Sequence, residues 1–192
     1  MMRRIGVLAI VAAIAAGMGI EAKVALARFG TRPTGSDGNE RGSTAGETDA
    51  IARRRSPEAL VTEGERLVMR GEVIEAISLY EEAQALHTFF SVGAQSWNIL
   101  CWYGSLWGHA EEVLEACEQA VKLDPDNVEI RDSRGLARAL VGDTDGAIED
   151  FQAFVDASEN EPRRFQRQNW IEMLQAGENP FTPDVLRMLF ID

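Results

Sequence analysis

The sequence contains few of the residues from which catalytic and metal sites are usually built. Among its 192 residues are two cysteines, Cys101 and Cys117, and two histidines, His87 and His109. Two cysteines exclude a small scaffold held together by many disulfides, and two histidines leave little material for a metal site. The sequence also contains no phosphate-binding loop and no serine-centred elbow. We therefore expect no cofactor, no metal and no catalytic residue.

Positive charge is scarce as well. The net charge is −12, and residues 57–192 contain 26 Asp or Glu against 10 Lys or Arg. A protein that binds nucleic acid needs an excess of Lys and Arg on one face. The composition therefore argues against a nucleic-acid partner and predicts a strongly acidic folded region.

An uncharged, apolar run of 16 residues lies near the N-terminus, from Ile5 to Ile20. It follows two arginines and precedes Ala25-Leu26-Ala27, an order that is typical of a secretory signal peptide. A membrane span usually needs about 20 apolar residues, so the run is short for one. We predict that residues 1–27 are a cleaved signal peptide, with an uncleaved membrane anchor as the alternative and neither as a third reading. In the first two cases the rest of the chain would lie outside the cytoplasm, in the periplasm or the cell exterior.

Residues 28–56 are rich in Gly, Ser, Thr and charged residues and show no sustained apolar period. This composition predicts a flexible linker. We interpret the run Arg53-Arg54-Arg55 as a solvated basic cluster, and contact with anionic lipid or an acidic partner is the alternative.

From residue 57 onward the sequence repeats with a period near 34. Gly108 and Gly142 are 34 residues apart, and Gly71 precedes Gly108 by 37. A helix-length segment lies on each side of every one of these glycines. Such self-similarity is the signature of stacked helix hairpins, each of which buries its apolar face only against a neighbour. We predict three units, each made of a helix, a glycine turn and a second helix: 57–90, 94–127 and 128–161.

The remaining 31 residues, 162–192, are expected to cap the array. Pro162 is suited to open a helix of about 15 residues that Gly177 would end. Thr182 and Pro183 would then cap and start a short last helix. Its apolar residues are Val185, Leu186, Leu189 and Phe190. Terminal repeats need a covering element, which these two helices would supply.

Together these features resemble the tetratricopeptide repeat family over about residues 57–161. The matching residues are Gly64, Gly71, Ala76, Tyr80 and Ala83 in the first unit, Trp97, Leu100, Gly108, Ala120 and Pro125 in the second, and Gly135, Gly142, Ala147 and Phe151 in the third. Arg131 stands where the family has a large apolar residue, and Cys117 replaces an aromatic one. The segment after the last unit is similar to terminal units of bacterial arrays. The resemblance implies an all-α fold, a short right-handed α-solenoid of about three hairpins closed by capping helices.

The resemblance also implies a partner-binding groove, because in this family the first helix of every unit lines a concave surface. By register, the groove residues are Val61, Glu65, Met69, Asn98, Trp102, Ser105, Leu106, Asp132 and Leu136. The groove columns contain no Lys or Arg, so we expect no counterpart of the family's basic clamp for a chain end. An acidic-rimmed apolar groove centred on Trp102 favours a protein or peptide with basic and hydrophobic side chains. Packing of Trp102 against a neighbouring unit is the alternative.

Cys101 and Cys117 lie on the two helices of one unit, at similar heights around the Gly108 turn. In an oxidising compartment this pair can form a disulfide. The alternatives are two small buried thiols that fill helix contacts, or a Cys–His nucleophile that uses His109.

We predict from these observations a non-enzymatic scaffold or adaptor that is exported from the cytoplasm. One alternative is a structural subunit of an envelope assembly that contacts its partners through an outer acidic surface. The other is an enzyme of unrecognised type. A membrane contact is expected only through an uncleaved N-terminal segment.

Overall fold

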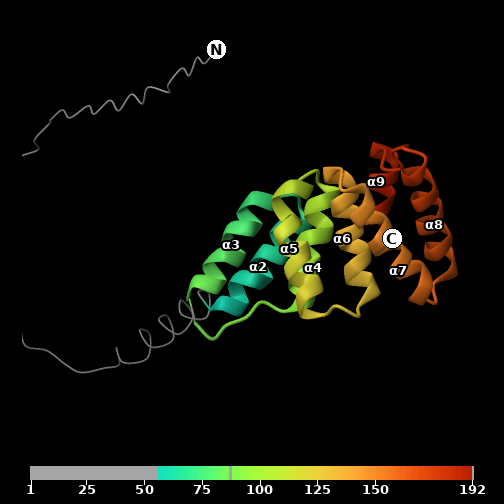
Figure 1. The fold of residues 1–192 in the computed structure, drawn as a ribbon. Helices are drawn as coiled ribbons and strands as arrows, with labels where there is room; N and C mark the ends of the chain where they lie inside the picture. The colour runs from blue at the N-terminus through green and yellow to red at the C-terminus, as the bar shows by residue number, and fades with distance from the viewer. Residues whose placement is uncertain (1–55, 87, 192) are drawn as a thin grey trace, which may run out of the picture. The chain divides into compact units, whose positions relative to one another are not determined.

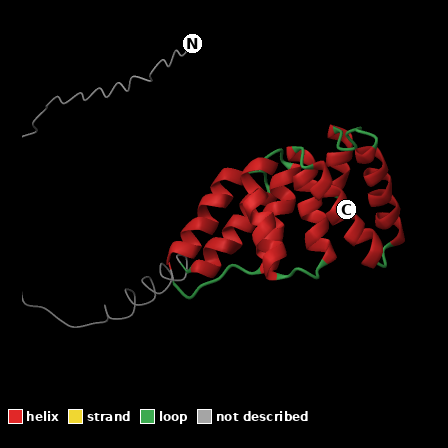
Figure 2. Ribbon diagram, viewed as in Figure 1, coloured by secondary structure: helices red, strands yellow, loops and turns green. Residues whose placement is uncertain are grey.

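A computed structural model describes residues 56–86 and 88–191, so the predicted signal peptide and most of the predicted linker lie outside the described residues. Contacts divide the chain into two units, Met1–Asn39 and Glu40–Asp192, and every described helix belongs to the second. The described residues form eight helices and no strand (Figures 1 and 2). The helices are α2 (Pro57–Met69), α3 (Val73–Leu86), α4 (Ala94–Leu106), α5 (Ala110–Leu123), α6 (Val128–Val141), α7 (Thr144–Ala157), α8 (Glu161–Gln175) and α9 (Pro183–Leu189).

Six of these helices form three hairpins, α2 with α3, α4 with α5, and α6 with α7. The first helices of neighbouring hairpins also contact each other, and the hairpins follow one another in chain order (Figure 1). This arrangement confirms the predicted all-α solenoid. None of the described helices is long and apolar enough to cross a membrane.

The turns and helix ends follow from local sequence. Gly71, Gly108 and Gly142 have φ values of 87°, 86° and 89°, a left-handed conformation that favours glycine. The Asn127 side chain caps α6, and the Asp143 side chain accepts from the Gly146 amide at the start of α7. Each unit therefore begins and ends where short-range chemistry directs it.

Within each hairpin a small residue of the first helix allows a close approach of the second. A Cβ atom added at Gly64 would lie 2.7 Å from the Tyr80 ring, and one at Gly135 would lie 2.9 Å from the Phe151 ring. Tyr80 and Phe151 are both fully buried. The aromatic rings of the first and third units therefore need glycine opposite them.

The C-terminal region continues the pattern beyond the third hairpin. In α8, Pro162 lies in the first turn and Asn160 caps the helix, and Gly177 follows its end with a φ of 77°. The Thr182 hydroxyl caps α9 by accepting from the Val185 amide. α8 packs against α7, and α9 contacts α4 of the second hairpin. The last helix, α9, therefore lies against α4, the first helix of the second hairpin.

Candidate partner-binding site

A pocket lies where α4, α6 and α8 meet. It is lined by Asn98 and Trp102 of α4, Glu129 and Ser133 of α6, and Arg163 of α8. Residues four apart on a helix share one face, so each of the first two helices presents a pair of side chains to the pocket. The structure thus brings together Asn98 and Trp102, two residues at the centre of the predicted groove.

Two polar atoms at this pocket have no partner. Within the described part of the chain, Asn98 Oδ1 and Arg163 Nε are buried and form no hydrogen bond. One is an acceptor and the other a donor, and a buried polar group left unpaired costs about 1–3 kcal/mol. An unpaired acceptor and an unpaired donor therefore belong to two residues that line the pocket beside Trp102.

Arg163 places a basic side chain in the groove, which differs from the expectation that none would lie there. It lies 34 residues after Glu129, and its Nη1 is 2.6 Å from the Glu129 carboxylate. The sequence register was drawn over three first helices, whereas α8 continues it as a fourth. The charge of Arg163 is already paired with Glu129 and Asp132, so it is no free cation for a chain end.

Beneath the pocket, Asp132 and Arg167 form a buried ion pair. Both side chains are at most 1% exposed, and Arg167 Nη2 lies 2.6 Å from Asp132 Oδ2. The Arg167 guanidinium also lies over the Trp170 ring, 4.5 Å from its centroid. Burial raises the pKa of Asp132, while the hydrogen bond and charge of Arg167 act to lower it. Asp132 is therefore an internal ion-pair partner rather than an accessible acidic group of the groove.

The other predicted groove residues fall into two sets. Val61 is buried, Glu65 is half-buried and Met69 is exposed, and all three lie on α2 of the first unit, outside the pocket. The second set is buried toward the C-terminal helices: Ser105, Leu106 and Leu136. Leu106 and Leu136 share a core cluster with Leu189 of α9. Partner binding at these residues stays a prediction.

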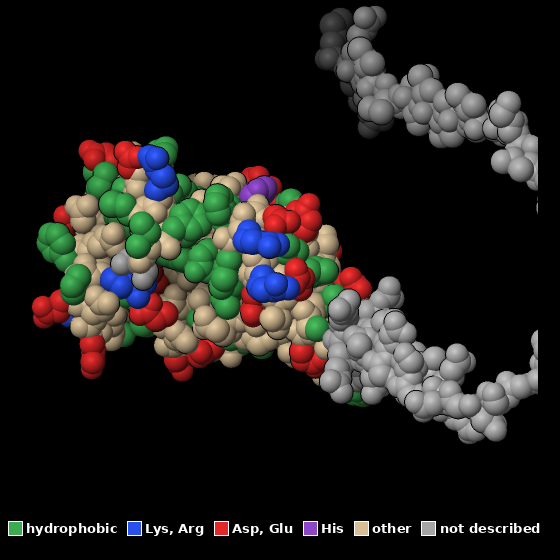
Figure 3. Space-filling model, turned by 180° about the vertical axis from the view of Figure 1, so that it is seen from behind, with side chains coloured by type: hydrophobic (Ala, Val, Ile, Leu, Met, Phe, Trp, Pro, Cys, Tyr) green, Lys and Arg blue, Asp and Glu red, His purple; other side chains and the backbone are tan. Residues whose placement is uncertain are grey.

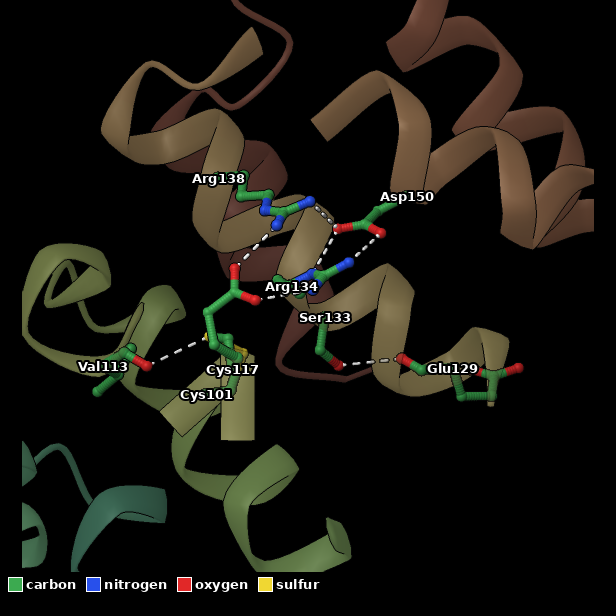
Figure 4. The surroundings of a disulfide bond; sticks show 9 residues. Cys101, Val113, Cys117, Glu129, Ser133, Arg134, Arg138 and Asp150 are labelled. Atoms are coloured by element: carbon green, nitrogen blue, oxygen red, sulfur yellow. Dashed lines mark hydrogen bonds and ion pairs between the residues drawn. A yellow bond between two sulfur atoms is a disulfide. The ribbon is translucent and has the colours of Figure 1, made fainter. Parts of the chain in front are cut away.

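Cys101 and Cys117 form a disulfide in the structure, with a Cα–Cα distance of 4.9 Å (Figure 4). Both residues are fully buried. Neither sulfur is a thiolate in this state, so the arrangement provides no cysteine nucleophile for His109. The described residues contain no group of three or more His, Cys, Asp or Glu that could hold a metal ion.

Beside the disulfide lies an ion-pair network that sequence reasoning missed (Figure 4). Arg131, Arg134 and Arg138 of α6 all contact the carboxylate of Asp150, which is 0% exposed. The distances are 3.1, 2.8 and 3.0 Å. Partial burial, the largest single effect, acts to lower the pKa of Arg134, but the hydrogen bonds and charges of Asp150 and Glu118 together outweigh it and raise that pKa. The departure at Arg131, followed by arginines three and seven residues later, was the available sequence signal.

The fold is thus an α-solenoid of helix hairpins with a pocket across successive first helices. Residues 108–175 match the model of the tetratricopeptide repeat family. Over 110 residues the chain is 27% identical to an Arabidopsis thaliana protein described as "DnaJ protein P58IPK homolog". The match covers 57% of this chain but only 22% of that protein. No solved structure matches the chain.

The resemblance to tetratricopeptide repeats that the sequence shows is therefore confirmed over residues 108–175. Repeats of this family are generally non-enzymatic and bind proteins or peptides.

Proposed function

We propose that the chain is an exported scaffold or adaptor that binds an extended peptide segment of its partner in the pocket between α4, α6 and α8. The observation that carries this proposal is the pair of unpartnered atoms, Asn98 Oδ1 and Arg163 Nε, in one pocket. A peptide group carries one N–H donor and one C=O acceptor, which complement these two atoms. Binding a peptide backbone would relieve two buried polar groups at once.

Trp102 and the surrounding charge define the side chains of such a peptide. Trp102 is partly buried and leaves ring surface for an apolar side chain. The excess of carboxylates over basic residues in residues 57–192 favours approach of a positively charged segment. The proposed partner therefore carries basic and hydrophobic residues in an extended stretch.

The test begins with a displayed random peptide library, from which the best-binding peptide is taken for affinity measurements. Trp102→Ala and Asn98→Ala should each weaken binding of that peptide at least tenfold, because each removes a contact made in the pocket. Phe165→Ala and Asn169→Ala are matched controls, since both residues are exposed on α8 outside the pocket and should leave affinity unchanged. Equal binding by all four variants would rule out the pocket and favour the outer surface.

Export is supported by two independent features. The first 27 residues have the order of a signal peptide, and the buried disulfide is of a kind that persists in oxidising compartments. Cell fractionation of a C-terminally tagged chain, with sequencing of its mature N-terminus, tests this part. A start at Arg28 in a soluble extracytoplasmic fraction supports a diffusible module, and an intact N-terminus in membranes supports a tethered one. An intact cytoplasmic chain contradicts export.

A further inference from the structure

α9 covers the end of the first-helix face that lies away from the pocket. Its Leu189 is buried, and the ring of the following Phe190 lies 4.7 Å from the Trp107 ring and 6.4 Å from the Tyr103 ring. Leu106 and Leu140 belong to the same cluster. In Figure 3, the view from behind, hydrophobic side chains gather in the middle of the molecule. α9 is thus seated on apolar surface contributed by α4 and α6.

α9 is amphipathic, with one apolar side and one exposed side, as are peptide helices that bind in grooves. Val185, Leu186, Leu189 and Phe190 follow an i, i+1, i+4, i+5 spacing and pack into the cluster. Asp184, Arg187 and Met188 are exposed on the other side. The contacts that α9 makes with α4 are therefore apolar side-chain contacts of the kind another amphipathic helix also provides.

The chain before α9 is held in place independently of it. The Phe181 ring is buried, 4.9 Å from the Trp170 ring and 6.1 Å from the Phe151 ring. Thr182 then separates this anchor from the helix, which begins at Pro183. Among the described residues, no hydrogen bond or ion pair joins 183–191 to another helix. Displacing α9 would therefore leave the Phe181 anchor and α8 where they are.

α9 also fits this surface incompletely. Beside Leu186 is a second pocket, lined by Ser105, Glu111, Glu112 and Leu140 among others. Ser105 is fully buried, and within the described chain its hydroxyl has no hydrogen-bond partner. Two carboxylates and an unpaired hydroxyl form a site that suits the ammonium or guanidinium group of a basic side chain. α9 places Leu186 at the edge of this pocket and no basic group in it.

We propose that α9 is a displaceable internal ligand, and that this second site binds an amphipathic helix of a partner protein in its place. The partner helix carries large apolar residues at the spacing of α9 and a Lys or Arg whose side chain enters this second pocket, whereas Arg187 of α9 is exposed and pairs with Asp184. It gains the contacts to Glu111, Glu112 and Ser105 that α9 lacks. This site is distinct from the extended-peptide pocket, so either proposal can fail without the other.

The test uses the full chain and a fluorescent synthetic peptide of residues 182–192, with binding followed by anisotropy. The wild-type chain should bind this peptide weakly, because its own α9 holds the site. Phe190→Ala loosens α9 and should increase affinity at least tenfold. Met188→Ala is the matched control, since Met188 is exposed, and should bind as the wild type does. Circular dichroism checks that each variant is folded.

A second experiment tests the proposed basic side chain of the partner helix. Peptides carrying one Lys at each position in turn are compared, and one of them should bind the wild-type chain at least fivefold better than the parent peptide. Glu111→Gln with Glu112→Gln should abolish that gain. Equal peptide affinity of a folded Phe190→Ala variant and the wild type would overturn the proposal. If Phe190→Ala unfolds the chain, α9 amides that exchange hydrogen as slowly as those of α8 in the wild type would overturn it, and faster exchange in α9 would support it.

Discussion

The Tyr80 side chain joins the first two units through its hydroxyl. The ring packs on Gly64, and the hydroxyl donates a hydrogen bond to the Ser96 carbonyl oxygen at 2.8 Å. Burial raises the pKa of Tyr80 well above its ordinary value, and the nearby Glu65 charge adds to the effect. The folded chain therefore keeps this phenol neutral at pH values where an exposed tyrosine ionises.

Alkaline pH should consequently destabilise the chain. Above about pH 10 the unfolded chain loses the Tyr80 proton while the folded chain retains it, so the free energy of unfolding falls as pH rises. Tyr80→Phe should cost about 1 kcal/mol at pH 7 through the lost hydrogen bond, and it should lose less stability between pH 9 and 11 than the wild type. Urea unfolding at several pH values measures both effects. Parallel pH profiles of the two chains would contradict the prediction.

The buried carboxylate of Asp150 balances the positive charges of three arginines. Asp150→Asn removes the charge that Arg131, Arg134 and Arg138 share, and breaking a buried ion pair on one side typically costs about 3 kcal/mol. The adjacent Glu149 pairs with Arg131 on the exposed surface, so Glu149→Gln should cost less than about 1 kcal/mol. Chemical denaturation of both variants provides the comparison. Similar losses from the two would show that Asp150 is not the centre of the network.

At the scale of the helices, the disulfide occupies a position that the other units fill differently. Gly64 with Tyr80, Cys101 with Cys117 and Gly135 with Phe151 are each 16 residues apart, on the first and second helix of a unit. In the outer two units a ring packs on a glycine. In the middle unit a covalent bond spans the same gap, so this hairpin is held together by chemistry that depends on oxidation.

Reduction should therefore weaken the middle unit selectively. Opening a loop of this length typically costs about 3 kcal/mol. Cys117 Sγ lies 3.3 Å from the Val113 carbonyl oxygen, where a free thiol would donate a hydrogen bond, so the reduced chain is expected to stay folded.

The matched variant is Cys101→Gly with Cys117→Phe, which restores the pair found in the third unit. Its stability should not change with reductant, whereas that of the wild type should fall. The melting temperatures of the wild type and of the double variant, measured with and without dithiothreitol, test this difference. An unchanged wild-type melting temperature would contradict this account.

At the scale of the molecule, features set by neighbouring residues could be read from the sequence. The turns at Gly108 and Gly142 and the cap at Thr182 depend on local backbone chemistry and were predicted residue by residue. Asn98 and Trp102 lie together because they are four residues apart on one helix, and the 34-residue period aligns that face with the neighbouring first helices.

Features that depend on distant partners were not predicted. Arg163 and Arg167 contact residues 31 to 35 positions earlier, and the sequence alone shows only basic residues on a capping helix. Arg131, one of the three arginines around Asp150, stands where the family pattern led us to expect an apolar residue. Leu106 is buried because α9 packs against α4. The repeat period of the sequence does not predict this contact.

The distance along the chain between α4 and α9 has a consequence for synthesis. α9 begins about 80 residues after α4 ends. At ordinary translation rates those residues take roughly 4 to 16 seconds to make. For that interval the apolar surface around Leu106, which is buried in the finished molecule, has emerged without its cover, and transiently exposed apolar surface is prone to aggregation. A nascent chain of this protein therefore presents to ribosome-associated chaperones a surface that the finished molecule conceals.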